Sequence, residues 1–156
     1  MTAGFSTVLL DALAGGLTVR FRAQGGSMYP TIRDGEVITV APVPTATING
    51  GDVLLCRCGS RVLAHRVIAI THDDGREYFH LRGDAKGGCD APVRAADIVG
   101  RVISVARRQR TIVLCGRIAR LRRAARTMAS RVNAIVRRQR YRLRDALCYP
   151  SPPFWA

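Results

Sequence analysis

The residues of this chain best suited to carry out a reaction are one serine, one histidine and two aspartates. Ser27 lies between a Gly-Gly pair and Tyr29-Pro30, so its hydroxyl sits on a turn whose backbone proline restricts. A serine hydroxyl becomes a good nucleophile only when a neighbouring base removes its proton. A plain turn between strands has the same composition, so Ser27 alone leaves both interpretations open.

His65 is the best candidate for that base. It lies in the middle of a predicted strand at residues 61–71, on the apolar face of that strand. The other two histidines, His72 and His80, flank an Asp-Asp-Gly turn, where exposure is expected. A histidine among apolar residues is by itself more often a packed residue than a catalytic one.

A catalytic histidine also needs an acceptor that orients its ring. The Gly-rich loop at residues 83–90 supplies two carboxylates, Asp84 and Asp90. Aspartate among glycines is also a common way to cap a loop, and this structural interpretation stays open.

The elements around these residues predict a mainly β fold. Residues 17–24 alternate apolar and polar side chains and lead directly to Ser27, as a half-buried strand would. Turn signals recur about every ten residues, which favours hairpins of short antiparallel strands. Further strands are predicted at 36–41, 52–57, 61–71, 77–81 and 97–106, after a short helix at 3–14 that a Gly-Gly pair ends.

Positive charge is concentrated in the last third of the chain. The sequence has 25 Lys/Arg and 11 acidic residues, and residues 1–100 hold ten of each, which leaves fifteen basic residues and one acid for 101–156. Apolar residues spaced by three and four predict a long basic helix from about 115 to 147. We therefore expect a β domain at 1–106 and an Arg-rich helical extension at 107–156.

Three roles for this extension are open. Its apolar side could pack on the β domain, with the arginines in solvent. It could instead dock on an anionic membrane surface or on a partner protein. Binding to nucleic acid, in which the arginines would neutralise phosphates, is the least favoured of the three.

Composition also indicates the cellular compartment of the protein. The five cysteines are an odd number with irregular spacing, which favours reduced thiols over disulfides or a metal site. No stretch approaches the roughly 18–20 apolar residues that a spanning helix needs, and residues 1–16 lack the basic start of a secretory signal. We expect a cytoplasmic protein, with peripheral attachment to the membrane as an alternative.

Five short motifs occur in a specific order. They are Ser27-Met28-Tyr29-Pro30-Thr31, Gly35-Glu36-Val37, Gly51-Asp52-Val53-Leu54, His65-Arg66-Val67-Ile68, and Gly83-Asp84 through to Asp90. Together they resemble the S24/S26 peptidase family, the signal peptidase I-like serine proteases, over about residues 17–105. The histidine in the fourth motif is similar to the endoplasmic-reticulum, archaeal and spore-forming-bacterial branch, since the common bacterial enzymes have lysine there.

This resemblance implies a signal-peptidase-like β core and a serine endopeptidase that cleaves a precursor peptide or protein. It implies that Ser27 is the nucleophile, that His65 is the general base, and that Asp90, or less favourably Asp84, orients the histidine. Substrate would bind beside the nucleophile motif, at Gly26, Met28, Tyr29 and Pro30. No cofactor and no metal are required by this mechanism.

Two features depart from the family pattern. The family usually has a hydroxyl residue two positions before the nucleophile, where this chain has Gly25; loss of one such oxyanion donor costs about 10²–10³ in rate. A membrane anchor helix is also missing from the sequence, which favours a substrate other than an ordinary translocating preprotein.

The alternative from another class is a non-catalytic or self-cleaving regulator that binds nucleic acid, because the S24 side of the family includes repressor autoproteases. Residues 1–16 are too short for a helix-turn-helix, which argues against it.

Overall fold

The computed structural model describes residues 3–59, 61–85 and 90–115. The chain divides into two compact units, and the first, residues 1–116, contains everything that is described. The basic helix predicted at 115–147 lies almost entirely outside the described residues, as do Cys89 and Cys148.

One helix, eight strands and two short 3-10 turns make up the described part of the chain. In chain order they are α1 (Ala3–Ala14), β1 (Val19–Arg22), β2 (Val37–Ala41), η1 (Thr45–Thr47), β3 (Val53–Cys58), β4 (Arg61–Asp73), β5 (Arg76–Arg82), β6 (Val93–Arg94), η2 (Ala95–Asp97), β7 (Ile98–Arg107) and β8 (Arg110–Val113).

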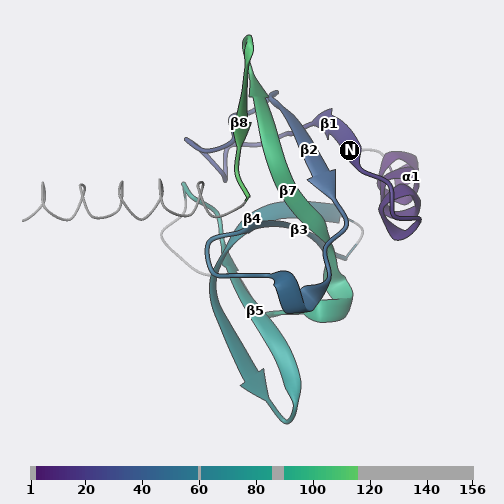
Figure 1. Ribbon diagram of the computed structural model, residues 1–156, viewed down its shortest axis with the longest axis vertical. Helices are drawn as coiled ribbons and strands as arrows, with labels where there is room; N and C mark the ends of the chain where they lie inside the picture. The colour runs from purple at the N-terminus through teal and green to yellow at the C-terminus, as the bar shows by residue number, and fades with distance from the viewer. Residues whose placement is uncertain (1–2, 60, 86–89, 116–156) are drawn as a thin grey trace, which may run out of the picture. The chain divides into compact units, whose positions relative to one another are not determined.

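The strands form a single antiparallel sheet (Figure 1). Its order is β1-β2-β7-β3-β4-β5-β6, and β8 pairs with β7. β7 joins the two halves, because its N-terminal part pairs with β3 and its C-terminal part with β8, while β2 runs along its other edge. The strand before the Ser27 turn and the strand that carries His65 therefore belong to the same sheet.

The predicted mainly β architecture and the N-terminal helix are confirmed, with strand ends shifted by one or two residues in most cases. Two strands were not predicted, β6 and β8. β8 continues the sheet beyond the predicted domain boundary at residue 106, through a two-residue turn in which Arg108 has φ 54°. Its β-branched run, Thr111-Ile112-Val113, is a strand signal that the surrounding arginines obscure.

α1 ends because of its Gly-Gly pair. Gly16 has φ +83°, which glycine adopts without steric cost. The backbone N–H of Gly16 donates to Leu13 O at 3.1 Å, and that of Leu17 donates to Ala12 O at 3.0 Å. This Schellman ending satisfies the last carbonyls of the helix and turns the chain into β1.

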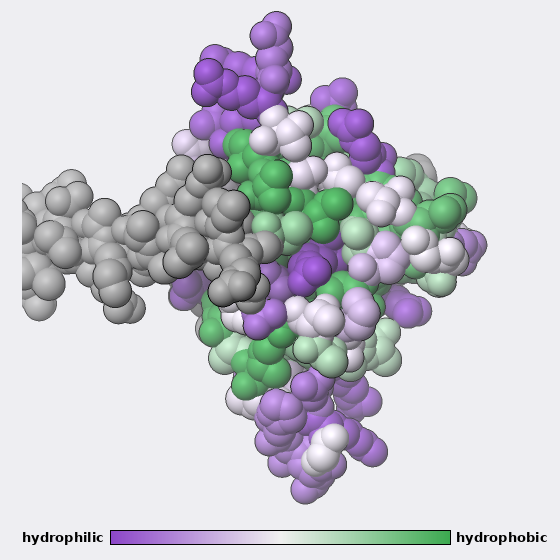
Figure 2. All heavy atoms as spheres, viewed as in Figure 1, coloured by the Kyte–Doolittle hydropathy of each residue, from purple (hydrophilic) through white to green (hydrophobic). Residues whose placement is uncertain are grey.

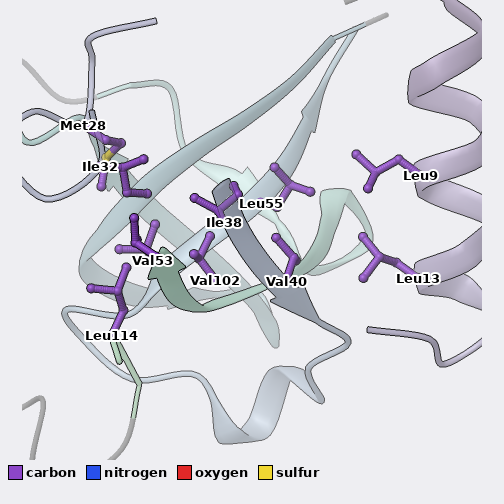
Figure 3. Close-up of a cluster of buried hydrophobic side chains, with 11 residues drawn as sticks. Leu9, Leu13, Met28, Ile32, Ile38, Val40, Val53, Leu55, Val102 and Leu114 are labelled. Atoms are coloured by element: carbon purple, nitrogen blue, oxygen red, sulfur yellow. The ribbon is translucent and has the colours of Figure 1, made fainter. Parts of the chain in front are cut away.

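β3 is the most buried strand, and its two faces belong to two hydrophobic clusters. Val53 and Leu55 face the cluster that α1 covers, while Leu54 and Cys56 face the cluster beneath the β4–β5 hairpin. In Figure 3, Leu9 and Leu13 reach the first cluster from α1. Members of the Ser27 turn reach the same cluster from its other side, so the core and the candidate site share side chains.

The β4–β5 and β7–β8 hairpins project from opposite ends of the sheet (Figure 1), and their tips are hydrophilic (Figure 2). The predicted Asp-Asp-Gly turn is present, and its two central residues, Asp74 and Gly75, have φ of 46° and 72° as a tight hairpin requires. Across the part of the chain that the structure describes, no helix has the length and apolar character needed to span a membrane.

Candidate active site

The Ser27 turn, residues 25–32, is fixed by hydrogen bonds at its start and within it. At its start, the backbone N–H of Gly25 donates to Asp34 Oδ1 at 2.7 Å, and Gly25 has φ +94°. Inside the turn, Tyr29 N–H donates to Gly26 O at 3.1 Å, and Ile32 N–H donates to Met28 O at 2.9 Å. These bonds fix the backbone that carries the serine.

Two side chains anchor the turn in the hydrophobic core. Met28 and Ile32 are only 4% and 3% exposed, and they lie side by side in Figure 3. Ser27 itself is half-buried. Its hydroxyl faces β4, where it meets His65.

His65 faces Ser27 from β4, and its Nε2 lies 3.1 Å from Ser27 Oγ. The imidazole is 3% exposed, in the middle of a strand that pairs with β3 through Leu54. A rigid, buried strand position restricts the ring to one orientation. The two residues are 38 positions apart in the chain, and the sheet brings them within hydrogen-bonding distance.

Asp90 binds the other ring nitrogen of His65, so that Ser27, His65 and Asp90 form a hydrogen-bonded row. Its Oδ2 is hydrogen-bonded to His65 Nδ1, and its own backbone N–H donates to the carbonyl of Leu81, a residue of β5 that pairs with Val67 of β4, at 2.9 Å. The carboxylate accepts from Nδ1–H, so in the neutral ring Nε2 is the acceptor for the hydroxyl of Ser27. This is the proton arrangement of a serine that is ready to be deprotonated.

Asp84, the alternative acid, binds elsewhere. Its carboxylate accepts from Arg66 Nε at 2.7 Å and Nη2 at 2.5 Å, and from the hydroxyl of Thr31. Arg66 also donates to Thr31 Oγ1 at 3.1 Å and to Gly51 O at 2.9 Å. Asp84 therefore ties the 83–90 loop to β4 and to the Ser27 turn, and the orienting bond to the histidine comes from Asp90.

The backbone at Gly83 packs closely against the site. A β-carbon placed there would lie 2.6 Å from Ser27 O and 3.3 Å from His65 Nε2. The next residues continue the contact, since Ala85 N–H donates to Ser27 O at 2.9 Å. The sequence marks this loop only as Gly-rich; the requirement for glycine at this position follows from the packing.

The predicted substrate-binding residues divide into two groups. Gly26, Tyr29 and Pro30 are exposed, and the Tyr29 ring, 55% exposed, lies beneath the Arg33 guanidinium at 5.9 Å. The side chain of Met28 is buried in the core and presents no surface to a ligand. The substrate role expected for Met28 stays a prediction, and because its side chain is buried such a contact would have to come from its backbone.

Sequence reasoning missed one ion pair beside the site. Arg107, the last residue of β7, binds both carboxylate oxygens of Glu36, and its Nη2 also donates to Pro30 O and Thr31 O, each at 3.1 Å. The hydrogen bonds from Arg107 hold the pKa of Glu36 below its ordinary value. Arg107 is one of many arginines in its region, so no local signal distinguishes it.

The other two histidines have partners outside this row. His72 contacts Glu77 and His80 contacts Thr71, all on the β4–β5 hairpin. Burial, assisted by the negative charge of Asp97, raises the pKa of the Cys56 thiol to about 12. Within residues 3–59, 61–85 and 90–115, no group of histidine, cysteine and acidic side chains is arranged to hold a metal ion.

The sequence matches no protein-family model, and it has no significant match among curated proteins.

Proposed function

We propose that this chain is a serine endopeptidase of the signal peptidase I-like S24/S26 type, which cleaves a precursor peptide or protein. The observation that carries the proposal is the row Ser27 Oγ, His65 Nε2, His65 Nδ1 and Asp90 Oδ2, with 3.1 Å between the first two atoms. The five ordered motifs of the sequence support the same assignment, since three of them supply this row.

The chemistry is acyl transfer. Ser27 Oγ attacks the carbonyl carbon of a peptide bond while His65 Nε2 accepts the hydroxyl proton. The imidazolium that forms is stabilised by the Asp90 carboxylate. His65 then gives the proton to the amine as the carbon–nitrogen bond breaks, which leaves an ester on Ser27. Water, deprotonated by the same histidine, hydrolyses the ester.

The negative oxygen of each tetrahedral intermediate needs fixed donors. We assign the backbone N–H of Ser27 to this role, because it lies on the attacking residue. The backbone N–H of Gly25 is bonded to Asp34 and belongs to the turn itself.

The sheet offers a place for an extended substrate. Residues 61–65 of β4 pair with β3 along one edge, and within the described residues the pairing of β4 with β5 starts only at Arg66. The other edge of this stretch leads directly to His65. A peptide that adds as a strand along it would bring its backbone past Ser27, in the β-augmentation mode.

A fluorophosphonate probe tests the proposal, because it reacts with a serine only when that serine is activated. We expect wild type to be labelled on the peptide that contains Ser27, as read by tandem mass spectrometry, and Ser27→Ala to lose the label. Ser104→Ala, which removes a half-buried hydroxyl from β7, is the matched control and should keep it. A wild-type protein that resists the probe, or a Ser27→Ala variant that is labelled equally, would refute the proposal.

A further inference from the structure

Arg107 is the link between the Ser27 turn and the half of the sheet built by β2 and β7. Its guanidinium forms a two-pronged bond with Glu36, which immediately precedes β2. From the same Nη2 it reaches the backbone carbonyls of Pro30 and Thr31. Its side chain is 26% exposed and that of Glu36 is 13% exposed, so solvent competes only partly for these bonds.

Thr31 is held from two directions. Its carbonyl oxygen accepts from Arg107, at the end of β7. Its hydroxyl is bonded to Arg66 and Asp84, which belong to β4 and to the loop after β5. His65 is the residue directly before Arg66. Arg66 on β4 and Arg107 on β7 therefore both bind Thr31, which lies four residues after Ser27 in the same turn.

We propose that Arg107 and Glu36 are positioning residues, which fix the Ser27 turn so that the serine hydroxyl stays within reach of His65. The inference rests on the proposed function, since it assigns these residues a role in that reaction. Neither touches a reacting atom. Their effect passes through the carbonyls of Pro30 and Thr31 to the backbone that carries Ser27.

The geometry requires arginine. A guanidinium presents a planar fork, here Nε and Nη2, that binds both oxygens of one carboxylate, and Nη2 still has a second N–H directed at the two carbonyls. A lysine ammonium at position 107 could neutralise Glu36, but it could not maintain the fork and both carbonyl bonds together. Displacements of about 1 Å at a reacting group can reduce a rate about 10²-fold, so a loosened turn should be visible in reactivity.

Arg101 provides a matched control on the same strand. It also pairs with a carboxylate, Asp52 Oδ2 at 3.2 Å, and it also reaches a backbone carbonyl, Thr47 O at 3.3 Å. Its side chain is 26% exposed, as is that of Arg107. The two arginines differ in that the partners of Arg101 lie outside the Ser27 turn.

The experiment compares Arg107→Lys, Arg107→Ala, Glu36→Gln and Arg101→Lys with wild type, at a temperature where melting curves show every variant folded. Labelling by a fluorophosphonate is followed over a range of probe concentrations, which separates probe binding from the maximal rate. For the Arg107 and Glu36 variants we expect the maximal rate to fall about tenfold or more, with probe binding little changed. Arg101→Lys should stay within about twofold of wild type.

A second measurement reads the turn without using reactivity. Amide hydrogen exchange reports the bonds from Ile32 N–H to Met28 O and from Ala85 N–H to Ser27 O. Both amides should exchange faster in the Arg107 variants than in wild type and Arg101→Lys.

Unchanged labelling in the folded Arg107 variants, or an equal loss in Arg101→Lys, would overturn the positioning role. If the wild-type protein is not labelled at all, the proposed function fails, and the exchange data then decide this inference alone. In that case faster exchange at both amides supports the conclusion that Arg107 fixes the Ser27 turn, and unchanged exchange refutes it.

Discussion

His65 and Arg66 are consecutive residues of β4 that bind the two aspartates of one loop, His65 through Asp90 and Arg66 through Asp84. Because successive side chains of a strand point to opposite faces, the two carboxylates bind on opposite faces of β4 although the loop is short. The loop is thereby fixed at both of its ends. One carboxylate lies in the row with Ser27, and the other lies in the framework around it.

This division predicts different consequences for the two aspartates. Asp90→Ala should leave the fold intact and lower fluorophosphonate labelling of Ser27 by about 10²–10⁴, because His65 loses the acceptor that sets its tautomer. Asp84→Ala should lower the free energy of unfolding by about 2–4 kcal/mol, because it leaves the Arg66 guanidinium without its carboxylate. Labelling kinetics and urea unfolding measure the two effects. The reverse assignment, a stable but unreactive Asp84→Ala and a reactive Asp90→Ala, would contradict the role given to Asp90.

The sequence was most informative where a pattern is local. Alternation, β-branched runs and the Asp-Gly turn located most strands and the β4–β5 hairpin, and the Gly-Gly pair located the end of α1. These signals depend on residues within a few positions of one another. β8 was missed because its four residues are flanked by the arginines of a region that composition alone marks as helical.

The candidate site was predictable only in part, for a similar reason. Ser27, His65 and Asp90 could be named as candidates from the motifs they occupy, but their contacts depend on sheet register. Arg107 and Glu36 are 71 positions apart in the chain, and no residue near either of them indicates that they pair. The buried orientation of Met28 likewise follows from packing against the core, which a motif does not specify.

The close packing at Gly83 predicts that even one methyl group is harmful there. In Gly83→Ala the new carbon would meet the backbone oxygen of Ser27 at 2.6 Å, so the loop or the turn must move. We expect a loss of about 1–3 kcal/mol in the free energy of unfolding and a lower rate of Ser27 labelling. Gly50→Ala is the control, because a β-carbon at Gly50 has no neighbour within 4 Å. Equal stability and reactivity in the two variants would show that the loop does not pack on the serine as described.

The backbone conformation at Gly25 predicts that a hydroxyl residue, which the resembled family usually has two positions before the nucleophile, cannot simply be introduced there. Its φ of +94° is a conformation that L-residues rarely adopt, although its β-carbon would meet no neighbour within 4 Å. Gly25→Ser should therefore lower the free energy of unfolding by about 1–2 kcal/mol through backbone strain. We expect no gain in the rate of Ser27 labelling. A faster and equally stable Gly25→Ser variant would mean that the turn readily adopts another backbone conformation.

The cysteines should differ sharply in reactivity. Burial raises the pKa of Cys56 to about 12, so at neutral pH the thiol stays protonated, and the thiolate is the reactive form. Cys58, two residues further along β3, is exposed. Brief treatment with iodoacetamide should modify Cys58 and leave Cys56 intact until the protein is unfolded, as read by peptide mapping. Early modification of Cys56 in the folded protein would contradict its burial.

The pair of Glu36 and Arg107 predicts how stability changes in acid. The pKa of Glu36 is lowered in the folded protein, chiefly by its hydrogen bonds to Arg107. A lowered folded pKa means that the ionised carboxylate contributes its full stabilisation above the pKa of the unfolded chain, and that this contribution is lost as the pH falls through the folded pKa. Glu36→Gln should therefore reduce the free energy of unfolding by about 1–2 kcal/mol at neutral pH. The difference from wild type should shrink once the pH is below the ordinary glutamate range.

Glu77→Gln, on the exposed β4–β5 hairpin, is the control and should change the free energy of unfolding by less than about 0.5 kcal/mol. Urea unfolding at a series of pH values measures all three proteins, and a Glu36→Gln deficit that stays constant into strong acid would contradict a charge-dependent clamp.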